Sequence, residues 1–313
     1  MRPPVDNLRG GAWLTLACLL LAGMGAVAKL LGQRLPSVEV AFFRSAVAFL
    51  FVLPLLLRAG WAVWRTSRLH LHLTRAALGT FALVCGFYAV THLPLAEATA
   101  LSFTKPLFQV VLAVLILGEV VRRRRWTALV VGFLGVLLML QPGGRAGIEP
   151  AAIAGLTAAI VAAFVSISLR ELAQTERHLT ILGYLGLVSS AVTAVPAALV
   201  WLWPTPTEWW LILLLGGLGA LGQGCLMRAY RHGEASVLAI FDYLRLPFAT
   251  ALGLWLFGEW PAIPAVAGAL LIASSTIYIA RREATLASTA TSRPPTPRGS
   301  PGTDDGPEGD RHR

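Results

Sequence analysis

Two basic side chains lie deep inside stretches of apolar sequence, where a charge is costly. Lys105 is about nine residues into the apolar segment 97–119, and Arg245 is about ten residues into the segment 235–258. At 1.5 Å per helical residue, Lys105 would lie roughly 13 Å deep and Arg245 similarly, near the middle of about 30 Å of hydrocarbon. A charge there costs about 2.5–3.5 kcal/mol, so we expect both side chains to bind an anionic or zwitterionic solute.

A proline lies close behind each of these cations. Pro106 directly follows the lysine, whereas Pro247 is two residues after the arginine. Proline removes a helical hydrogen bond, so we expect free backbone carbonyls near Ser102 and Tyr243, where a solute could dock.

Acidic and polar side chains in the same segments extend this candidate site. Asp242 is three residues before Arg245, which suits a solute contact and equally an ion pair within one helix. Asp242 and Glu97 are candidates for binding a coupling proton or sodium ion. Arg44 is a further solute-binding candidate, although so long a side chain could instead reach the membrane surface. The remaining candidates are polar side chains on expected helix faces: Tyr88, Ser102, Gln109, Gln223 and Tyr243.

One helix face would carry several of these groups. Glu97, Lys105 and Gln109 are separated by multiples of four residues, and Ser102 falls close to the same line. Side chains three and four residues apart share a helix face, so this spacing predicts a polar stripe suited to the wall of a cavity.

The composition places these side chains in a membrane. Of the 313 residues, 56% are hydrophobic and 13% are charged, far from the balance of a soluble domain. Ten apolar segments are long enough to be membrane helices, with the fifth the shortest. They span residues 11–31, 39–58, 73–92, 97–119, 126–141, 150–170, 180–203, 208–230, 235–258 and 261–280. We therefore predict an all-α polytopic membrane protein with ten transmembrane helices and exclude a cytosolic enzyme on a single anchor.

The basic residues predict the orientation in the membrane. With a cytoplasmic N-terminus, 20 of the 26 Lys and Arg residues fall on the inner side and two fall outside, which follows the positive-inside rule. Both termini are then cytoplasmic, in the inner (plasma) membrane. The net charge of +10 is read as this topology signal and not as a nucleic-acid-binding face. Residues 284–313 are polar and rich in proline, which predicts a disordered cytoplasmic tail.

The two halves of the chain resemble each other at an offset near 140. Pro54 matches Pro196, His92 matches His232, and Gly118-Glu119 matches Gly258-Glu259. Each half would contain five helices, an odd number, so the second half must lie inverted relative to the first. Inverted repeats are typical of secondary transporters, which bind their solute near the membrane midplane between the repeats.

This organisation resembles the drug/metabolite transporter superfamily, and more specifically proteins with two EamA domains. The stretch from Tyr88 to Leu140 carries most of the likeness, with Leu95-Ala96-Glu97-Ala98, Pro106 and Gly118-Glu119. The resemblance implies a central cavity between the repeats, alternating access and no cofactor. It gives a cytoplasmic N-terminus (1–10), a first repeat (11–141), a second, inverted repeat (150–281) and the tail (284–313).

We therefore predict a secondary transporter for a small polar metabolite, such as an amino acid, a nucleoside-type compound or a vitamin. The protein would work as a monomer or homodimer, in contact with membrane lipid and without metal or nucleic acid. The alternative is an intramembrane enzyme acting on a lipid or prenyl substrate, but the sequence has no metal-binding acidic motif and no serine nucleophile elbow. A channel is a third hypothesis, although the sequence contains no selectivity-filter motif.

Overall fold

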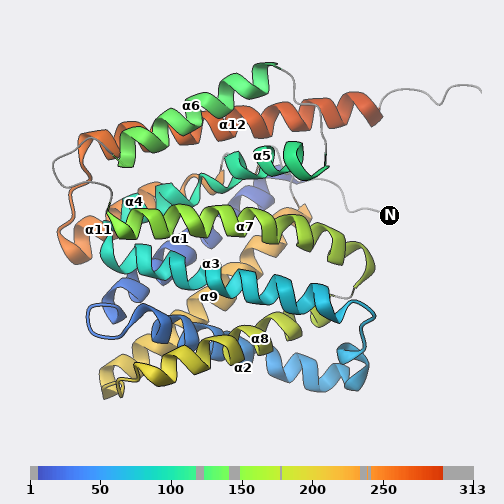
Figure 1. Ribbon diagram of the computed structural model, residues 1–313, viewed down its shortest axis with the longest axis vertical. Helices are drawn as coiled ribbons and strands as arrows, with labels where there is room; N and C mark the ends of the chain where they lie inside the picture. The colour runs from blue at the N-terminus through green and yellow to red at the C-terminus, as the bar shows by residue number, and fades with distance from the viewer. Residues whose placement is uncertain are drawn as a thin grey trace, which may run out of the picture.

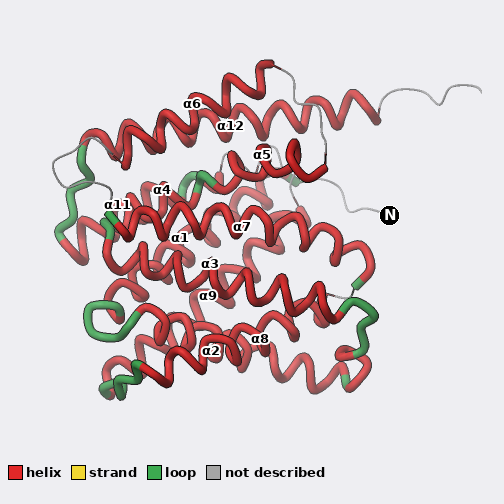
Figure 2. Tube along the Cα trace, viewed as in Figure 1, coloured by secondary structure: helices red, strands yellow, loops and turns green. Residues whose placement is uncertain are grey.

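The computed structural model describes residues 6–117, 123–140, 149–176, 178–232, 238 and 241–291. Throughout this part of the chain the regular structure is helical, and short turns join the helices (Figure 2). In the first half the helices are α1 (Asn7–Leu31), α2 (Ser37–Ala59), the short 3-10 helix η1 (Trp61–Trp64), α3 (Leu69–His92), α4 (Leu95–Ser102), α5 (Lys105–Leu117) and α6 (Arg123–Leu140). In the second half they are α7 (Pro150–Thr175), α8 (His178–Leu199), α9 (Pro206–His232), α11 (Arg245–Phe257) and α12 (Ile263–Thr291).

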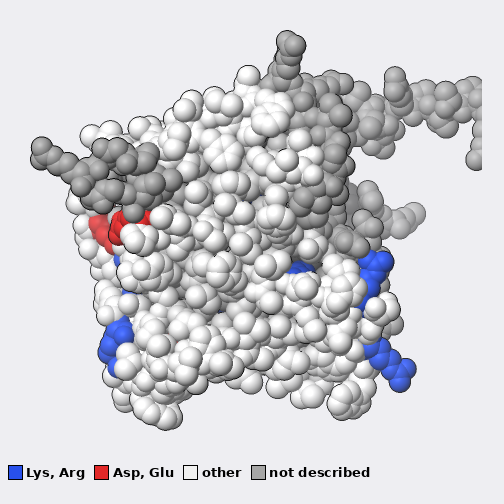
Figure 3. All heavy atoms as spheres, in the orientation of Figure 1, with Lys and Arg blue, Asp and Glu red and all other residues white. Residues whose placement is uncertain are grey.

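Five of these helices are long and apolar enough to cross a membrane: α1, α2, α3, α8 and α9. In a bilayer only helices or closed barrels satisfy all backbone hydrogen bonds, so an apolar, helical chain is what the medium requires. The prediction of an all-α membrane protein is confirmed at this level. Charged side chains gather toward opposite edges of the face in Figure 3, and most of the surface between those edges is uncharged.

The packing pairs helices from the two halves of the chain. α1 packs on α9 and α3 on α7, while α2 packs on α8 and α6 on α12 (Figure 1). Small residues allow the closest approach: a Cβ atom on Gly216 of α9 would lie 2.2 Å from a methyl of Val47, and one on Gly222 would lie 2.9 Å from Leu21. These two glycines therefore serve helix packing, as small residues commonly do in membranes.

Two helices are interrupted where the sequence places its buried cations. α4 ends at Ser102 and α5 begins at Lys105, with i→i+3 hydrogen bonds from Phe103 N–H to Ala100 and from Thr104 N–H to Leu101. α11 begins at Arg245 after the same tightening, in which Leu244 N–H donates to Phe241. A 3-10 turn carries the chain through the site where proline cannot continue the α-helical ladder.

This interruption changes two expectations. The Tyr243 carbonyl accepts a hydrogen bond from Leu246 N–H at 3.0 Å, so the turn uses the group that we expected to be free. The predicted stripe of Glu97, Lys105 and Gln109 assumed one continuous helix, whereas the break separates α4 from α5 between Ser102 and Lys105. The i+4 spacing therefore does not place Glu97 and Lys105 on one helix face.

The last helix is longer than the sequence suggested. α12 continues to Thr291, so residues 284–291 are helical and not part of a disordered tail. This stretch contains three Ala residues and one Leu, which favour helix, and it extends a helix that has already been nucleated.

Candidate functional site

The centre of the candidate site is formed where the two helix breaks meet. Arg245 at the start of α11 donates a hydrogen bond from Nη2 to Ser102 Oγ at the end of α4, at 2.9 Å. Its guanidinium carbon lies 4.9 Å from the ring centroid of Phe103. Phe103 in turn stacks on Tyr243, with ring centroids 4.6 Å apart and planes 32° apart. Two halves of the chain thus supply one arginine held by a hydroxyl and an aromatic face.

Lys105 and Asp242 lie within electrostatic reach of this arginine. Lys105 is the half-buried first residue of α5. Its ammonium group interacts electrostatically with the charges of both Arg245 and Asp242. Asp242 lies beside Cys18 of α1, with 3.8 Å between Oδ1 and the thiol Sγ. Among the described residues neither Lys105 nor Arg245 forms an ion pair with Asp242 within 4 Å. The site therefore holds two cations and one carboxylate without the structural salt bridge that the spacing allowed.

The arginine retains capacity for a ligand. Arg245 Nε is buried and has no hydrogen-bond partner in the described part of the chain. A guanidinium is planar and binds a carboxylate or phosphate through two parallel hydrogen bonds. Stacking on Phe103 and the bond to Ser102 fix that plane before a ligand arrives. The arrangement is suited to an anionic group.

Other predicted site residues lie apart from this centre. Tyr88 on α3 is partly exposed and stacks on His92, with ring centroids 4.2 Å apart. Gln223 on α9 is exposed, and Gln109 on α5 is half-buried. Arg44 on α2 lies beside Gly219 of α9, and its Nε is buried without a partner among the described residues. No hydrogen bond, ion pair or ring contact among the described residues joins any of these four side chains to Arg245.

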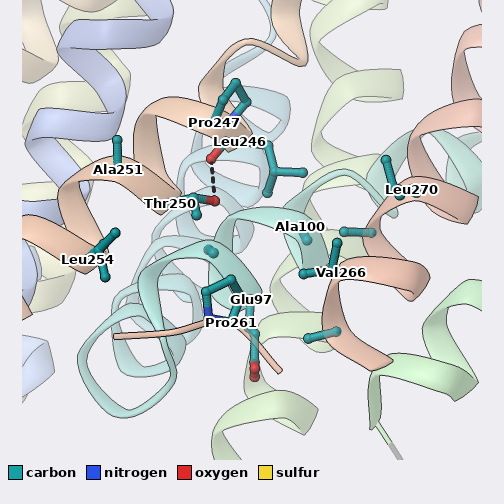
Figure 4. A pocket seen from close by; sticks show the side chains of 13 residues that line it. Glu97, Ala100, Leu246, Pro247, Thr250, Ala251, Leu254, Pro261, Val266 and Leu270 are labelled. Carbon is teal, nitrogen blue, oxygen red and sulfur yellow. Dashed lines mark hydrogen bonds between the residues drawn. The ribbon is translucent and has the colours of Figure 1, made fainter. Parts of the chain in front are cut away.

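Glu97 lines a separate pocket. This pocket has a volume of about 420 Å³ and lies between α4, α11 and α12 (Figure 4). Its walls are almost wholly apolar and include Ala100, Leu246, Pro247 and Leu254. Leu246 directly follows Arg245 in the chain, so the pocket begins next to the central residues and extends away from them.

A buried ion pair that we did not predict joins four segments near one end of the bundle. Lys29 of α1 is 8% exposed, pairs with Glu259 and donates a hydrogen bond to the Leu93 carbonyl. The other carboxylate oxygen of Glu259 accepts the Leu95 N–H at 2.8 Å, which caps the start of α4. Gly258 makes this possible: its φ of 66° ends α11 in the left-handed conformation and turns the chain back. The rule that identified Lys105, a charge in an apolar segment, also applied to Lys29.

The same end of the bundle, here called the α1–α2 end (residues 32–36, 93–94, 200–205 and 258–262), has further polar links. Arg34 pairs with Glu208 and donates to the Trp203 carbonyl at 2.8 Å. The hydrogen bond from Arg34 to the Glu208 carboxylate raises the pKa of Arg34, so the guanidinium stays protonated. Glu39 is fully buried and accepts the Leu202 N–H at 3.2 Å. Ion pairs and hydrogen bonds therefore join the two halves of the chain at the α1–α2 end.

At the opposite end, here called the α2–α3 end (residues 60–68 and 176), the links are fewer in the described part of the chain. Thr66 donates to Glu176 at 2.6 Å, and Tyr184 donates to the Trp64 carbonyl at 2.8 Å. Glu119, which the repeat matches to Glu259, lies outside the described residues. No group of three His, Cys, Asp or Glu side chains suited to a metal occurs within the described ranges.

The sequence matches the EamA-like transporter family twice, over residues 8–141 and 149–281. It is 34% identical over 285 residues to the pseudopaline exporter CntI of Pseudomonas aeruginosa (strain UCBPP-PA14), covering 88% of this chain and 98% of that one. It is 32% identical over 272 residues to the S-adenosylmethionine uptake transporter of Rickettsia prowazekii (87% and 92% covered). It is 36% identical over 286 residues to the riboflavin transporter of Rhizobium johnstonii (90% and 93% covered).

A solved crystal structure has the same fold, with a TM-score of 0.59 at 20% identity, covering 90% of this chain and 99% of the other. The relatives are named as transporters, which confirms the prediction that the chain is not an enzyme. The resemblance found in the sequence is likewise confirmed.

Proposed function

Because the chain belongs to the EamA-like transporter family, we propose that it is a secondary transporter for an anionic or zwitterionic metabolite. The family places it among multi-pass membrane proteins that move small molecules. The observation that carries the finer proposal is the pair of cations, Lys105 and Arg245, at the meeting point of the two helix breaks. Asp242 is the one acidic neighbour of Lys105 within the described residues, which leaves an excess of positive charge for a carboxylate or phosphate to neutralise.

The relatives are named for three different solutes, pseudopaline, S-adenosylmethionine and riboflavin, so their names do not choose one substrate. The chemistry of the site narrows the class. Arg245 offers a fork for one carboxylate, and Lys105 offers a compact charge nearby. The stacked rings of Phe103 and Tyr243 border the arginine, which favours an amphipathic solute with an apolar part beside its acidic group.

The two halves, residues 11–141 and 150–281, would form ten transmembrane passes as inverted repeats. The packing supports this. If each helix of one half is exchanged for its equivalent in the other, the contact of α1 with α9 becomes that of α7 with α3, and both are present. The contacts of α2 with α8 and of α6 with α12 map onto themselves. Such a pseudo-twofold relation is typical of carriers that expose one central site alternately to each side.

In this scheme the α1–α2 end must open for the solute to pass. The Lys29–Glu259 pair joins α1 to the end of α11, and Glu259 also caps α4. Moving these helices apart would break a buried ion pair, so solute binding or a coupling ion must supply the compensating free energy. Asp242 and Glu97 are the candidates for binding that proton or sodium ion. Both termini would be cytoplasmic in the inner membrane, with the α1–α2 end outside.

The proposal is tested by ligand binding before transport. Purified protein in detergent is screened by thermal unfolding against carboxylates, amino acids, nucleotides and vitamins, with Lys105→Met alongside. A ligand at 100 times its Kd should stabilise the folded state by about 2.7 kcal/mol, and the variant should lose that gain. A hit that is an uncharged or cationic solute, retained by Lys105→Met, contradicts the proposal. Saturable uptake of the hit into proteoliposomes then distinguishes a carrier from a channel.

A further inference from the structure

The pocket beside α12 is built almost entirely from small and apolar side chains. Alanines of three helices line it: Ala96 and Ala100 from α4, Ala251 from α11, and Ala265 and Ala269 from α12. Larger residues in these positions would fill the space of about 420 Å³. Figure 4 shows the wall residues of α4, α11 and α12 arranged around this space. The volume lies within the range of ligand pockets, which is about 300–1,000 Å³.

The pocket opens to the side of the bundle. Among its lining residues, Leu254, Val266 and Leu270 are 38%, 42% and 63% exposed. α12 packs chiefly on α6, and its contact with α4 is sparse, which leaves the space between them unfilled by the described residues. In a membrane protein such an apolar side faces hydrocarbon. Water is unfavourable in an apolar cavity that offers it few polar partners, so the surrounding lipid is the available occupant.

Glu97 gives one end of the pocket a charge. It is two residues from the start of α4, so it lies near the level of the lipid headgroups and not in the hydrocarbon centre. The carboxylates of Glu149 and Glu259 are close enough to interact electrostatically with the Glu97 carboxylate. Lys29, the nearby cation, is already paired with Glu259. The local field is therefore negative, which attracts an ammonium group and repels an anionic headgroup.

We propose that this pocket binds one phospholipid with a primary-amine headgroup, such as phosphatidylethanolamine. An acyl chain occupies the apolar space between α12 and the α4–α11 pair, and the ammonium group donates a hydrogen bond to Glu97. The site is distinct from the central cations, and its existence does not depend on which solute the protein carries.

Native mass spectrometry of the full-length protein tests this assignment. The protein is equilibrated with nanodiscs of phosphatidylethanolamine or phosphatidylglycerol with identical acyl chains and is then released from them. We expect one retained phosphatidylethanolamine per protein and about tenfold less phosphatidylglycerol, the preference of one charge-assisted hydrogen bond. Glu97→Gln should abolish the preference between headgroups, whereas Glu149→Gln, at an exposed position outside the pocket, should change it less.

A substitution that fills the pocket provides a second test of the assignment. Ala251→Phe, at an exposed position on the pocket wall, should remove the retained lipid. Ala191→Phe, at an exposed position of α8 outside the pocket, is the matched control and should retain it. Equal retention of both lipids by the wild type overturns the headgroup assignment. Retention unchanged in Ala251→Phe, or a dimer that this variant dissociates, overturns the assignment of the pocket to lipid.

Discussion

The chain contains only two lysines, and both lie in apolar helices with opposite surroundings. Lys29 is paired with Glu259, donates to the Leu93 carbonyl and lies 5.3 Å from the ring centroid of Phe257. Lys105 has Arg245 and Asp242 as charged neighbours but forms no ion pair within the described part of the chain. A buried charge with complete partners holds helices together, whereas one that lacks a partner is ready for a ligand. Residue type and hydrophobic surroundings alone do not distinguish the two.

The largest expected effect tests the paired lysine. Lys29→Met leaves the half-buried Glu259 carboxylate without its cation, and breaking a buried pair from one side costs up to about 3–5 kcal/mol of unfolding free energy. Equilibrium unfolding in mixed micelles measures this loss. The double variant Lys29→Met/Glu259→Gln should recover part of it, because glutamine carries no charge and can still accept the Leu95 N–H. A single variant as stable as the wild type would show that the pair is not structural.

The unpaired lysine should give the opposite result. Lys105→Met is expected to lower transport about 100-fold, equivalent to about 2.7 kcal/mol of lost interaction with an anionic solute. Its stability should fall far less than that of Lys29→Met, since no partner is left uncompensated. Leu115→Met, at an exposed position of the same α5, serves as control. Proteoliposome uptake and micellar unfolding are measured on the same preparations, and a variant that loses stability while keeping uptake reverses the comparison.

These two lysines also show how far sequence reasoning extends. Hydropathy predicts the all-α membrane class, and the resemblance of motifs such as Leu95-Ala96-Glu97-Ala98 and Gly118-Glu119 predicts the family, because these are local signals. The offset near 140 predicts the inverted halves. The depth of Lys105 and Arg245 follows from residue counting, and the structure places both at helix breaks. The ion-pair partner of a buried charge, by contrast, does not follow from such signals. Glu259 is 230 positions from Lys29, and only the left-handed turn at Gly258 brings it there.

Other differences have equally local causes. The polar stripe on α4 and α5 failed because a 3-10 turn interrupts the period at Phe103 and Thr104. Cys18 and Phe103 were not candidates, although they contact Asp242 and Arg245 respectively. A buried thiol and an aromatic ring are common in any apolar core, so their types carry no signal before the fold is known.

A smaller effect distinguishes the contribution of the charge of Arg245 from that of its guanidinium geometry. Arg245→Lys keeps the positive charge but loses the planar fork, the bond to Ser102 and the stacking on Phe103. We expect the KM for the transported solute to rise about tenfold. Binding measured by calorimetry on the same variant distinguishes weaker binding from slower movement. Wild-type affinity in Arg245→Lys would mean that charge alone selects the solute.

The smallest effect concerns the hydroxyl that holds the arginine. Ser102→Ala removes one hydrogen bond to Arg245, worth about 1 kcal/mol, so affinity should fall about fivefold. Ser102→Thr retains a hydroxyl and should restore most of this. Because both residues belong to one interaction, Ser102→Ala should add little when combined with Arg245→Lys. Additive losses in the double variant would place the two side chains in separate roles.

The helix breaks have a consequence for the empty carrier. A long helix has its positive dipole end at the membrane surface, in water, but each break creates a new N-terminus within the protein, worth roughly half an elementary charge. α5 and α11 both begin in this way, with Lys105 and Arg245 as their first residues. Dipole and side chain therefore add at each break, and a dry, unloaded centre would be electrostatically unfavourable. Between solutes the centre should remain hydrated, and the helices around it should close tightly only when an anion is bound.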